Sequence, residues 1–399
     1  MSLQLLIVGG GIGGLAAALA LGRGGHRVDV LEQAARFEEF GAGIQLGPNV
    51  VRRLRALGVE PALQDVAARP TRLSVRSVQG GDELARMVFD AARVRRYGAP
   101  YLCVHRADLH AVLLGALKAQ GPSRLSLHTG ARVSRIATRG GEAVCAAADD
   151  TRAWEADGLV GADGLWGATR ARVIEHDAPP HRTGHTAWRA LLAQAALPQA
   201  LRSDRIQIWL GARVHVVAYP VRAGDFLNVV VLAEAAPPEG AGLDARGWDQ
   251  EASLDTLRQA TRQAGAGLRA LLDAVPAWRA WTLHDRPPLQ GPAQMAQARI
   301  ALLGDAAHPM LPYLAQGAGM AIEDAATLAE VLAGVDAGQL PAAFAQYAAQ
   351  RWARNARVQA RARRNARIFH ATGLLRWGRD WAMRLGGARV LDVPWLYAG

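Results

Sequence analysis

An acidic residue between an apolar run and a glycine-rich loop is the first candidate for chemistry in this 399-residue chain. Asp305 follows the run 300–303 and Gly304, and a Pro/Gly loop leads into a helix-forming segment at 320–332. This order predicts a carboxylate at a strand end and backbone N–H groups at a helix start. The carboxylate suits a polyol chain such as ribitol, and the N–H groups suit an electron-rich ring edge. The candidate cofactor-binding residues are Gly304, Asp305, Gly317, Ala318, Gly319 and Met320.

A second set of candidates lies at the N-terminus. The apolar run 5–8 leads into GGGIGG at 9–14, an alanine-rich helix is expected at 15–22, and a second strand at 28–31 ends at Glu32. The pattern G-x-G-x-x-G between a strand and a helix allows close approach to a pyrophosphate, and Glu32 is placed to accept a hydrogen bond from a ribose. Gly9, Gly11, Gly13, Gly14 and Glu32 are therefore predicted to bind a dinucleotide.

The glycine pattern alone does not distinguish FAD from NAD. No second pattern with its own strand and helix follows, and a nicotinamide dehydrogenase would have no use for the Asp305 segment. A bound flavin explains both. Arg106 opens an apolar-striped helix, where a cation opposes the helix dipole unless an anion lies nearby. Contact with the cofactor and a plain surface arginine both remain open for Arg106.

The segment 183–234 is rich in strand-like runs without a long helix between them, which predicts an antiparallel sheet. His215 and Tyr219 share one face of a strand, with Val217 between them. Four residues of extended chain span roughly 13 Å, so the two side chains would bracket a ligand rather than share a proton. Taken alone, they are more often structural residues.

Charge and composition exclude little. The net charge of +11 comes almost wholly from scattered arginines, and we interpret it as coding bias plus affinity for anionic cofactors and substrates, without nucleic-acid or membrane binding. The arginines of the C-terminal helical part are expected on a solvated face.

Two cysteines predict neither a disulfide framework nor a cysteine metal site and fit a cytoplasmic location. Residues 3–22 are apolar, but their central glycines favour strand–turn–helix over a signal peptide or a membrane span.

Three motifs in order resemble the group A FAD-dependent aromatic hydroxylases: Gly9–Gly14, Asp163-Gly164 with Arg170, and Gly304-Asp305. The resemblance covers essentially the whole chain, although Gly167 stands where the family often has serine. It implies an α/β fold: a Rossmann-like, p-hydroxybenzoate hydroxylase-like FAD-binding domain with an inserted antiparallel β-sheet substrate domain and C-terminal helices. The implied domains are 1–72, 101–172 and 285–340 for FAD, 73–100 and 173–284 for substrate, and 341–399 for the helical segment.

Within that family, the stretches 41–50, 105–114 and 307–325 are similar to 6-hydroxynicotinate and 3-hydroxybenzoate hydroxylases. The resemblance adds Gly43, Ile44, Arg106 and Asp163 to the cofactor-binding residues. It makes His215, Tyr219, Tyr313 and Pro309 catalytic candidates, and Gln45, His215, Tyr219 and Tyr313 substrate contacts. Gln45 and Tyr313 stand where the nicotinate enzyme has histidines, and Pro312 where the benzoate enzymes tend to have glutamine. The substrate therefore stays open.

The implied reaction is hydroxylation of a small aromatic acid or hydroxypyridine through a flavin C4a-hydroperoxide, with FAD as cofactor, NADH or NADPH as reductant and O2 as co-substrate. The alternative is a related flavin-dependent oxidoreductase acting on a larger aromatic substrate without ring hydroxylation. A halogenase is disfavoured because the chain lacks W-x-W-x-I-P. A flavin-free nicotinamide reductase and a non-enzymatic arginine-rich binding protein are the remaining alternatives. The chain is expected to be a monomer or a homodimer.

Overall fold

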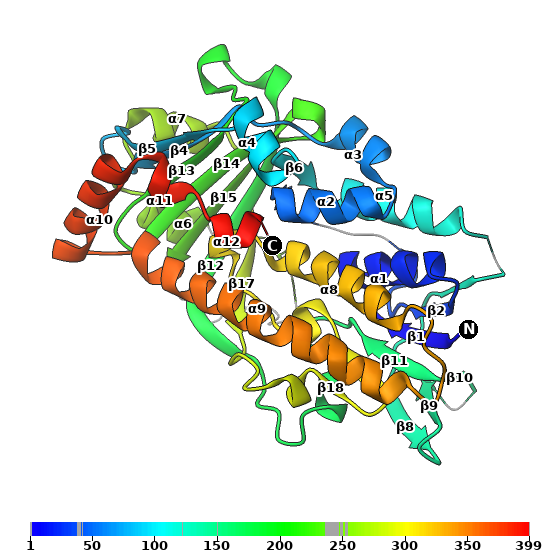
Figure 1. Ribbon diagram of the computed structural model, residues 1–399. Coiled ribbons are helices and arrows are strands. Elements are labelled where there is room, and N and C mark those ends of the chain that lie inside the picture. Colours follow the sequence, from blue (N-terminus) through cyan, green and yellow to red (C-terminus); the bar gives the residue numbers. More distant parts are fainter. Residues whose placement is uncertain are drawn as a thin grey trace.

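Two large β-sheets, each covered by helices, form the framework of the molecule (Figure 1). The computed structural model describes residues 2–37, 41, 43–121, 123–149, 151–235, 247, 250–251 and 254–398. The chain passes between the two sheets several times, so each sheet is built from segments that are far apart in the sequence.

The first sheet has six strands in the order β18-β19-β11-β1-β2-β7. Five strands pair in parallel, and β18 pairs antiparallel with β19 at one edge. The bounds are β1 Gln4–Val8, β2 Arg27–Leu31, β7 Leu125–His128, β11 Gly158–Gly161, β18 Ala296–Gln297 and β19 Ile300–Leu302. Because β1, β11 and β19 are parallel neighbours, the loops after them meet at one edge. Those loops carry Gly9–Gly14, Asp163-Gly164 and Gly304-Asp305.

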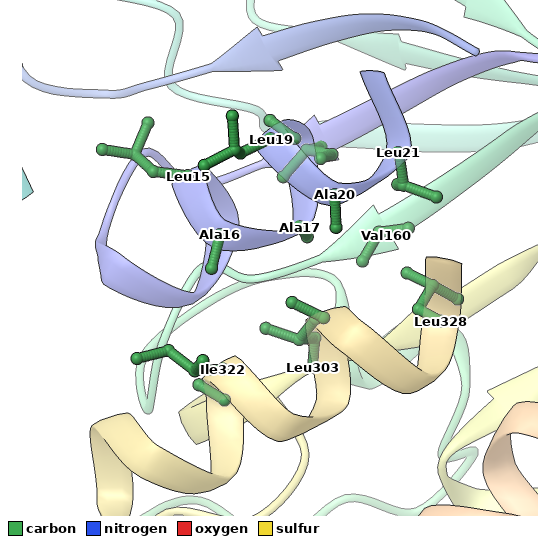
Figure 2. Packing of buried hydrophobic residues seen from close by; sticks show 14 of the residues in the cluster. Leu15, Ala16, Ala17, Leu19, Ala20, Leu21, Val160, Leu303, Ile322 and Leu328 are labelled. Atoms are coloured by element: carbon green, nitrogen blue, oxygen red, sulfur yellow. The ribbon is translucent and has the colours of Figure 1, made fainter. Parts of the chain in front are cut away.

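Three helices pack around this sheet and form most of its core. They are α1 (Ile12–Arg23), α5 (Arg106–Lys118) and α8 (Gly317–Leu332). Ala16 and Ala20 on α1 face α8 and let it approach closely, and Ile322 and Leu328 of α8 pack on this side of α1 (Figure 2). A Cβ on Gly13 would lie 2.8 Å from the Leu303 side chain, so glycine is needed at this contact. The helix α8 begins at Gly317, three residues earlier than the segment expected from the sequence.

The second sheet has eight strands in the order β16-β17-β12-β15-β14-β13-β4-β5. The bounds are β4 Arg72–Ser77, β5 Glu83–Val88, β12 His181–Ala193, β13 Ile206–Leu210, β14 Val214–Val221, β15 Phe226–Glu234, β16 Gln250–Glu251 and β17 Arg279–Asp285. All pairs are antiparallel except β13 with β4, which is parallel. The strands of the segment 183–234 pair antiparallel, as expected, and the one parallel pair arises because β4 joins the sheet from a distant part of the chain.

Two small sheets complete the strands. One is a meander of β8 (Arg135–Arg139), β9 (Ala143–Ala147) and β10 (Ala153–Ala156), and the other pairs β3 (Gly43–Leu46) with β6 (Leu102–His105). The remaining helices are α2 Pro48–Ala56, α3 Glu60–Val66, α4 Ala91–Tyr97, α6 Leu254–Ala260, α7 Ala266–Asp273, α9 Leu340–Phe369, α10 Gly373–Gly386, α11 Ala388–Leu391 and α12 Pro394–Tyr397. No helix in the described part of the chain has both the length and the apolar character needed to cross a bilayer.

The C-terminal helix α9 runs along the molecule from the first sheet to the second (Figure 1). The expectation that its arginines form a solvated face holds for some of them and is wrong for others. Arg351 is 5% exposed, and Arg354 and Arg363 are partly buried in ion pairs. Their carboxylate partners lie on other elements, which the sequence pattern of α9 alone does not reveal.

Candidate active site

The loop after β1 is folded tightly against the loop after β11. Gly9 has φ of +109°, and a Cβ there would lie 2.3 Å from the Ala162 carbonyl oxygen. A Cβ on Gly14 would lie 1.9 Å from the Gly9 carbonyl oxygen. The first two motifs therefore touch, and only glycine fits at these positions. The missing side chains leave the backbone N–H groups at the start of α1 open to a phosphate.

Glu32 lies at the end of β2, beside this loop. Its Oε2 accepts a hydrogen bond from the Gly10 N–H at 2.7 Å, and its Oε1 accepts one from the Ala34 N–H at 2.7 Å. A buried histidine that the sequence analysis did not select, His110, contacts the Gly10 carbonyl oxygen through Nε2 at 2.8 Å. The carboxylate is thus held at the position where a ribose hydroxyl is expected.

Asp163, in the second motif, is fixed by a turn. It accepts hydrogen bonds from the Thr169 N–H at 2.9 Å and from the Thr169 hydroxyl. Burial raises the pKa of Asp163, and the Thr169 hydrogen bonds oppose that shift. A Cβ on Gly167 would lie 2.0 Å from the Asp163 carboxyl carbon, so the departure from serine makes room for this carboxylate. Arg170 then donates to the carbonyl oxygens of Ala306 (3.1 Å) and Ala307 (2.6 Å), which ties the second motif to the third.

The third motif faces the N-terminus of α8. Gly304 has φ of +60°, and Asp305, which is exposed, follows in the short 3₁₀ turn Gly304–Ala306. A Cβ on Gly317 would lie 3.9 Å from Asp305 Oδ1, so the carboxylate lies beside the first residue of the helix. A Cβ on Gly319 would lie 2.6 Å from Val50 Cγ2, which explains the glycine there. The carboxylate at a strand end and the helix N-terminus are therefore adjacent in space.

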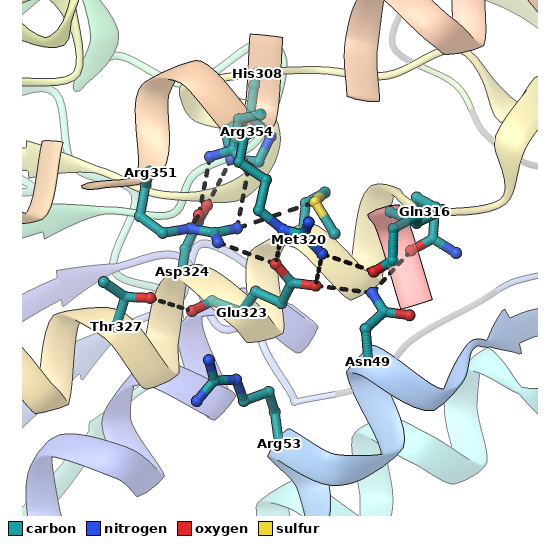
Figure 3. Close-up of polar contacts among 12 residues, drawn as sticks. Asn49, Arg53, His308, Gln316, Met320, Glu323, Asp324, Thr327, Arg351 and Arg354 are labelled. Atoms are coloured by element: carbon teal, nitrogen blue, oxygen red, sulfur yellow. Dashed lines mark hydrogen bonds and ion pairs between the residues drawn. The ribbon is translucent and has the colours of Figure 1, made fainter. Parts of the chain in front are cut away.

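A buried charged cluster lies under this helix N-terminus (Figure 3). Arg351 donates to Glu323 at 3.0 Å and to Asp324 at 2.7 Å, and Arg354 donates to Glu323 at 2.6 and 2.8 Å. Asp324 also accepts from the Gly304 N–H at 3.1 Å and contacts His308 Nε2 at 2.5 Å. Burial alone would raise the pKa values of Glu323 and Asp324, but the surrounding cations and donors lower both. This cluster was not predicted, and the paired acids at 323 and 324 are its only local signal in the sequence.

On the second sheet, a cluster of aromatic and histidine side chains surrounds His215. His215 Nδ1 lies 2.9 Å from His370 Nε2, and its ring centroid lies 5.1 Å from that of Tyr313. The Tyr313 hydroxyl in turn contacts His185 Nδ1. Burial lowers the pKa of His215 well below its ordinary value, with the neighbouring histidines and Arg379 acting in the same direction, and burial raises the pKa of Tyr313. The four side chains are therefore held as neutral groups.

Tyr219 lies on the same strand and the same face as His215 but has a different partner. Its hydroxyl donates to the Gly43 carbonyl oxygen at 2.6 Å, while the Gly43 N–H donates to Asn228 Oδ1 at 2.9 Å. A Cβ on Gly43 would lie 2.5 Å from the Tyr219 ring. The contact joins β14 to β3, the strand that carries Ile44 and Gln45. Asn228 is a buried side chain that the sequence analysis missed, and its Nδ2 has no hydrogen-bond partner.

The remaining candidates lie around these groups. Gln45 Oε1 accepts a hydrogen bond from the Tyr101 hydroxyl at 2.9 Å. Pro309 is buried, and its carbonyl oxygen accepts from Gln359 Nε2 at 2.8 Å. Arg106 is the first residue of α5, and its side chain occupies the space in which a Cβ on Gly41 would lie. The structure thus brings His215 and Tyr313 into contact and keeps Tyr219 and Gln45 bonded to separate partners.

These features define the class of protein. Glycines at three adjacent strand ends, a ribose-positioned Glu32, and Asp305 beside a helix N-terminus fit the pyrophosphate, ribose and ribitol of an FAD molecule. The helix α8 packs on the first sheet, and His215 lies on the second sheet. Tyr313, in the segment that leads into α8, contacts His215 and so joins the two parts. The arrangement is that of a flavoprotein with a substrate sheet.

Comparison with known proteins gives the family. The model of the family described as FAD binding domain matches residues 2–362. The 3-hydroxybenzoate 6-hydroxylase of Polaromonas naphthalenivorans (strain CJ2) is 36% identical over 397 residues, covering 99% of this chain and 96% of that protein. The 6-hydroxynicotinate 3-monooxygenase of Pseudomonas fluorescens is 36% identical over 400 residues, covering 98% and 96%. Among solved structures, Klebsiella pneumoniae HpxO complexed with FAD and uric acid has a TM-score of 0.83 and 25% identity, covering 97% of this chain and 94% of that one.

The chain belongs to the FAD-dependent aromatic-ring monooxygenases of this FAD-binding family. FAD is its cofactor, and NAD(P)H is the reductant that the family uses. The predicted resemblance, fold class and reaction class are confirmed. The roles given to individual site residues and the domain boundaries stay predictions.

Proposed function

We propose that this monooxygenase hydroxylates the ring of a small aromatic acid or a hydroxypyridine, with His215 and Tyr313 beside the reacting ring. The contact between these two side chains supports the proposal most strongly, with ring centroids 5.1 Å apart. Tyr313 lies in the loop between Asp305 and the N-terminus of α8, and both ends of that loop are assigned to the cofactor. His215 lies on the substrate sheet, so the pair joins the two halves of the site.

FAD bound in the glycine cradle and reduced by NAD(P)H supplies the activated form of O2 that delivers oxygen to the ring. Gly9, Gly14 and Glu32 would hold its pyrophosphate and adenosine ribose, Asp305 its ribitol, and the first turn of α8 its electron-rich ring edge. The protein's own task is to bind the substrate, exclude water and move a proton.

His215 is the residue we assign to the proton. A hydrogen bond of 2.9 Å joins His215 Nδ1 to His370 Nε2, which fixes the His215 ring and leaves its Nε2 for the substrate. This nitrogen is unprotonated in the free protein, because burial lowers the pKa of His215. The proton of a phenolic or hydroxypyridine oxygen would pass to it in the complex, where the negative charge left on that oxygen stabilises the imidazolium, and the ring carbons ortho and para to that oxygen become more electron-rich. Tyr313 stays protonated, because burial raises its pKa, and orients an oxygen of the substrate. Tyr219 and Pro309 would not touch the reacting atoms. Tyr219 holds β3, the strand that carries Gln45, and Pro309 shapes the wall of the substrate site.

The test is a substrate screen with the FAD-loaded enzyme. Aromatic acids and hydroxypyridines are added one at a time, and NADH and NADPH oxidation, O2 consumption, H2O2 release and product mass are measured. We expect either the aromatic acids or the hydroxypyridines to stimulate the oxidation of NADH or NADPH. The product should be heavier than the substrate by one oxygen atom, or should be the corresponding decarboxylated compound. Stimulation with H2O2 release alone, or turnover of larger aromatic compounds without oxygen insertion, would contradict the proposal.

The proposal also includes O2 as co-substrate, a monomer or homodimer as the working form, and a cytoplasmic location. Cys103 and Cys145 are both free, which fits a reducing compartment. Light scattering of the purified protein and fractionation of cells test the last two points.

A further inference from the structure

Beside the substrate cluster, three potential metal ligands converge from different elements. His185 on β12 and Glu234 at the end of β15 are direct cross-strand partners. His370 follows α9, and its ring stacks on that of His185 with centroids 5.1 Å apart and an angle of 19°. Within the described part of the chain, this is the one set of three such side chains whose ligand atoms all lie within 4.8 Å of one another.

We propose that His185, Glu234 and His370 form a binding site for one transition-metal ion of the Zn²⁺ class. Two imidazoles and one carboxylate are a ligand set that zinc uses when its fourth position is open to water or another ligand. Nothing in the assigned flavin or substrate contacts requires Glu234.

The hydrogen bonds of the two histidines match those of metal-bound imidazoles. In each ring, one nitrogen forms a hydrogen bond with a side chain that is not a proposed ligand. His185 Nδ1 contacts the Tyr313 hydroxyl, and His370 Nε2 contacts His215 Nδ1. In His370 the other nitrogen, Nδ1, is buried and has no hydrogen-bond partner, although it lies 3.5 Å from Glu234 Oε1. Outer partners of this kind orient metal-binding histidines and set the nitrogen that carries the lone pair.

The site is reachable from solvent and needs only a small adjustment. His185 and Glu234 line an open groove of about 520 Å³, and the Glu234 side chain is 39% exposed. Zn–N and Zn–O bonds of about 2.0–2.1 Å in tetrahedral geometry bring ligand atoms to roughly 3.3 Å from one another. Rotation of Glu234 and of the partly buried His185 can close the remaining gap, while the buried His370 stays in place.

The two arginines nearest the ligands leave Glu234 free to bind a cation. Arg213 lies 3.8 Å from Glu234 and is exposed, so it can move away when a cation binds. Arg379, which approaches His370 from α10, is paired with Asp380 at 2.8 Å. Hydrogen bonds to Tyr313 and His215 leave one nitrogen of each imidazole for the ion. A divalent ion therefore meets a carboxylate and two neutral donors.

Occupancy would have a consequence for the reaction, and this consequence rests on the proposed function. An ion on His370 Nδ1 makes Nε2–H the donor to His215 Nδ1. In neutral His215, Nε2 then carries the proton and cannot take one from the substrate. We therefore expect Zn²⁺ to lower substrate-stimulated turnover.

The binding test uses tag-free, FAD-loaded enzyme that has been treated with a chelator and transferred to chelator-free buffer. Zn²⁺ binding is measured by calorimetry and by metal analysis after equilibrium dialysis. We expect one ion per chain, and an affinity at least tenfold weaker in Glu234→Gln and in His185→Gln. The matched control is His128→Gln, because His128 pairs with Asp29 at 2.9 Å without a third ligand, and its affinity should equal that of the native chain. The flavin absorbance spectrum verifies that each variant is folded.

Two outcomes would overturn the site: no saturable binding, or equal affinities in the native chain and in Glu234→Gln. The activity arm is separate. If Zn²⁺ binds as predicted but leaves turnover of an identified substrate unchanged, the metal site stands and the role of His215 as proton acceptor fails. If Zn²⁺ inhibits the native enzyme and Glu234→Gln equally, inhibition does not come from this site.

Discussion

Two buried polar clusters, one around Arg351 and one around His215, differ in charge. Around Arg351, the carboxylates of Glu323 and Asp324 are fully ionised, and each has several donors. Around His215, the groups are neutral, and His370 Nδ1 has no hydrogen-bond partner. Each cluster contains a buried histidine nitrogen without a hydrogen-bond partner, His308 Nδ1 in the first and His370 Nδ1 in the second, so the paired charges are what distinguishes them. Paired buried charges hold the segments that carry them in a fixed arrangement, whereas neutral buried histidines can exchange a proton with a ligand. We infer that the first cluster holds the cofactor loops in place and that the second does the chemistry.

The largest effect should come from His215→Ala. Loss of the proton acceptor should lower kcat by about 10²–10⁴-fold while FAD stays bound. Turnover of the identified substrate and the flavin absorbance of the purified variant measure the two parts. His176→Ala, at an exposed histidine, is the control and should keep full activity. Normal coupled hydroxylation in His215→Ala would remove His215 from the catalytic residues.

Arg351→Met should act on the other cluster and mainly on stability. The substitution leaves Glu323 and Asp324 buried with less compensation, which costs about 3–5 kcal/mol of unfolding free energy. Chemical denaturation measures it, with Arg364→Met, an exposed arginine on the same helix, changing the value by less than about 0.5 kcal/mol. If the two variants are equally stable, the cluster does not hold the fold.

The charged cluster also predicts a pH dependence. The folded pKa values of Glu323 and Asp324 lie below those of the unfolded chain, so their contribution is complete above the unfolded values of 4.5 and 3.8 and is lost as pH falls below them. Each carboxylate contributes a slope of about 1.4 kcal/mol per pH unit in that range. Unfolding free energies measured from pH 6 to pH 3 should give a shallower slope for Glu323→Gln than for the native chain. Parallel curves would mean that Glu323 is not stabilised in the fold.

The smallest effect should come from Tyr219→Phe. The variant loses a hydrogen bond to Gly43 and should lose about 0.5–1.5 kcal/mol of stability with little change in KM. Tyr347→Phe is the matched control, because that buried hydroxyl donates to the Leu302 carbonyl oxygen at 3.0 Å in the first sheet. A KM that rises only in Tyr219→Phe would show that Tyr219 contacts the substrate after all.

Much of the cofactor side could be predicted from the sequence. The strand–glycine–helix pattern at 4–23, the acid at Glu32 and the order of Asp163 and Asp305 are local signals, because turns and strand ends restrict the residue types that fit them. The strands around His215 could be predicted from their strand-like composition. The parallel pairing of β4 with β13 could not be predicted, since it joins segments more than a hundred residues apart.

The substrate side was predictable only in part. His215 and Tyr219 share a face, as the period of a strand requires. Their partners, His370 and Gly43, come from the end of α9 and from β3, and no spacing in the chain points to either. The buried state of Arg351 was missed for the same reason: its acids are on α8, and an arginine-rich helix by itself is typical of a solvated face.

The sequence by itself determined the class of this protein, because glycines and acids at strand ends are constrained by neighbours a few residues away. It determined that Asp305 and the N-terminus of α8 would lie together. Only the tertiary structure decided which buried polar groups form charged pairs and which stay neutral. That property depends on donors and acceptors from distant segments: it separates Glu323 and Asp324 from His215, and it brings His185, Glu234 and His370 together.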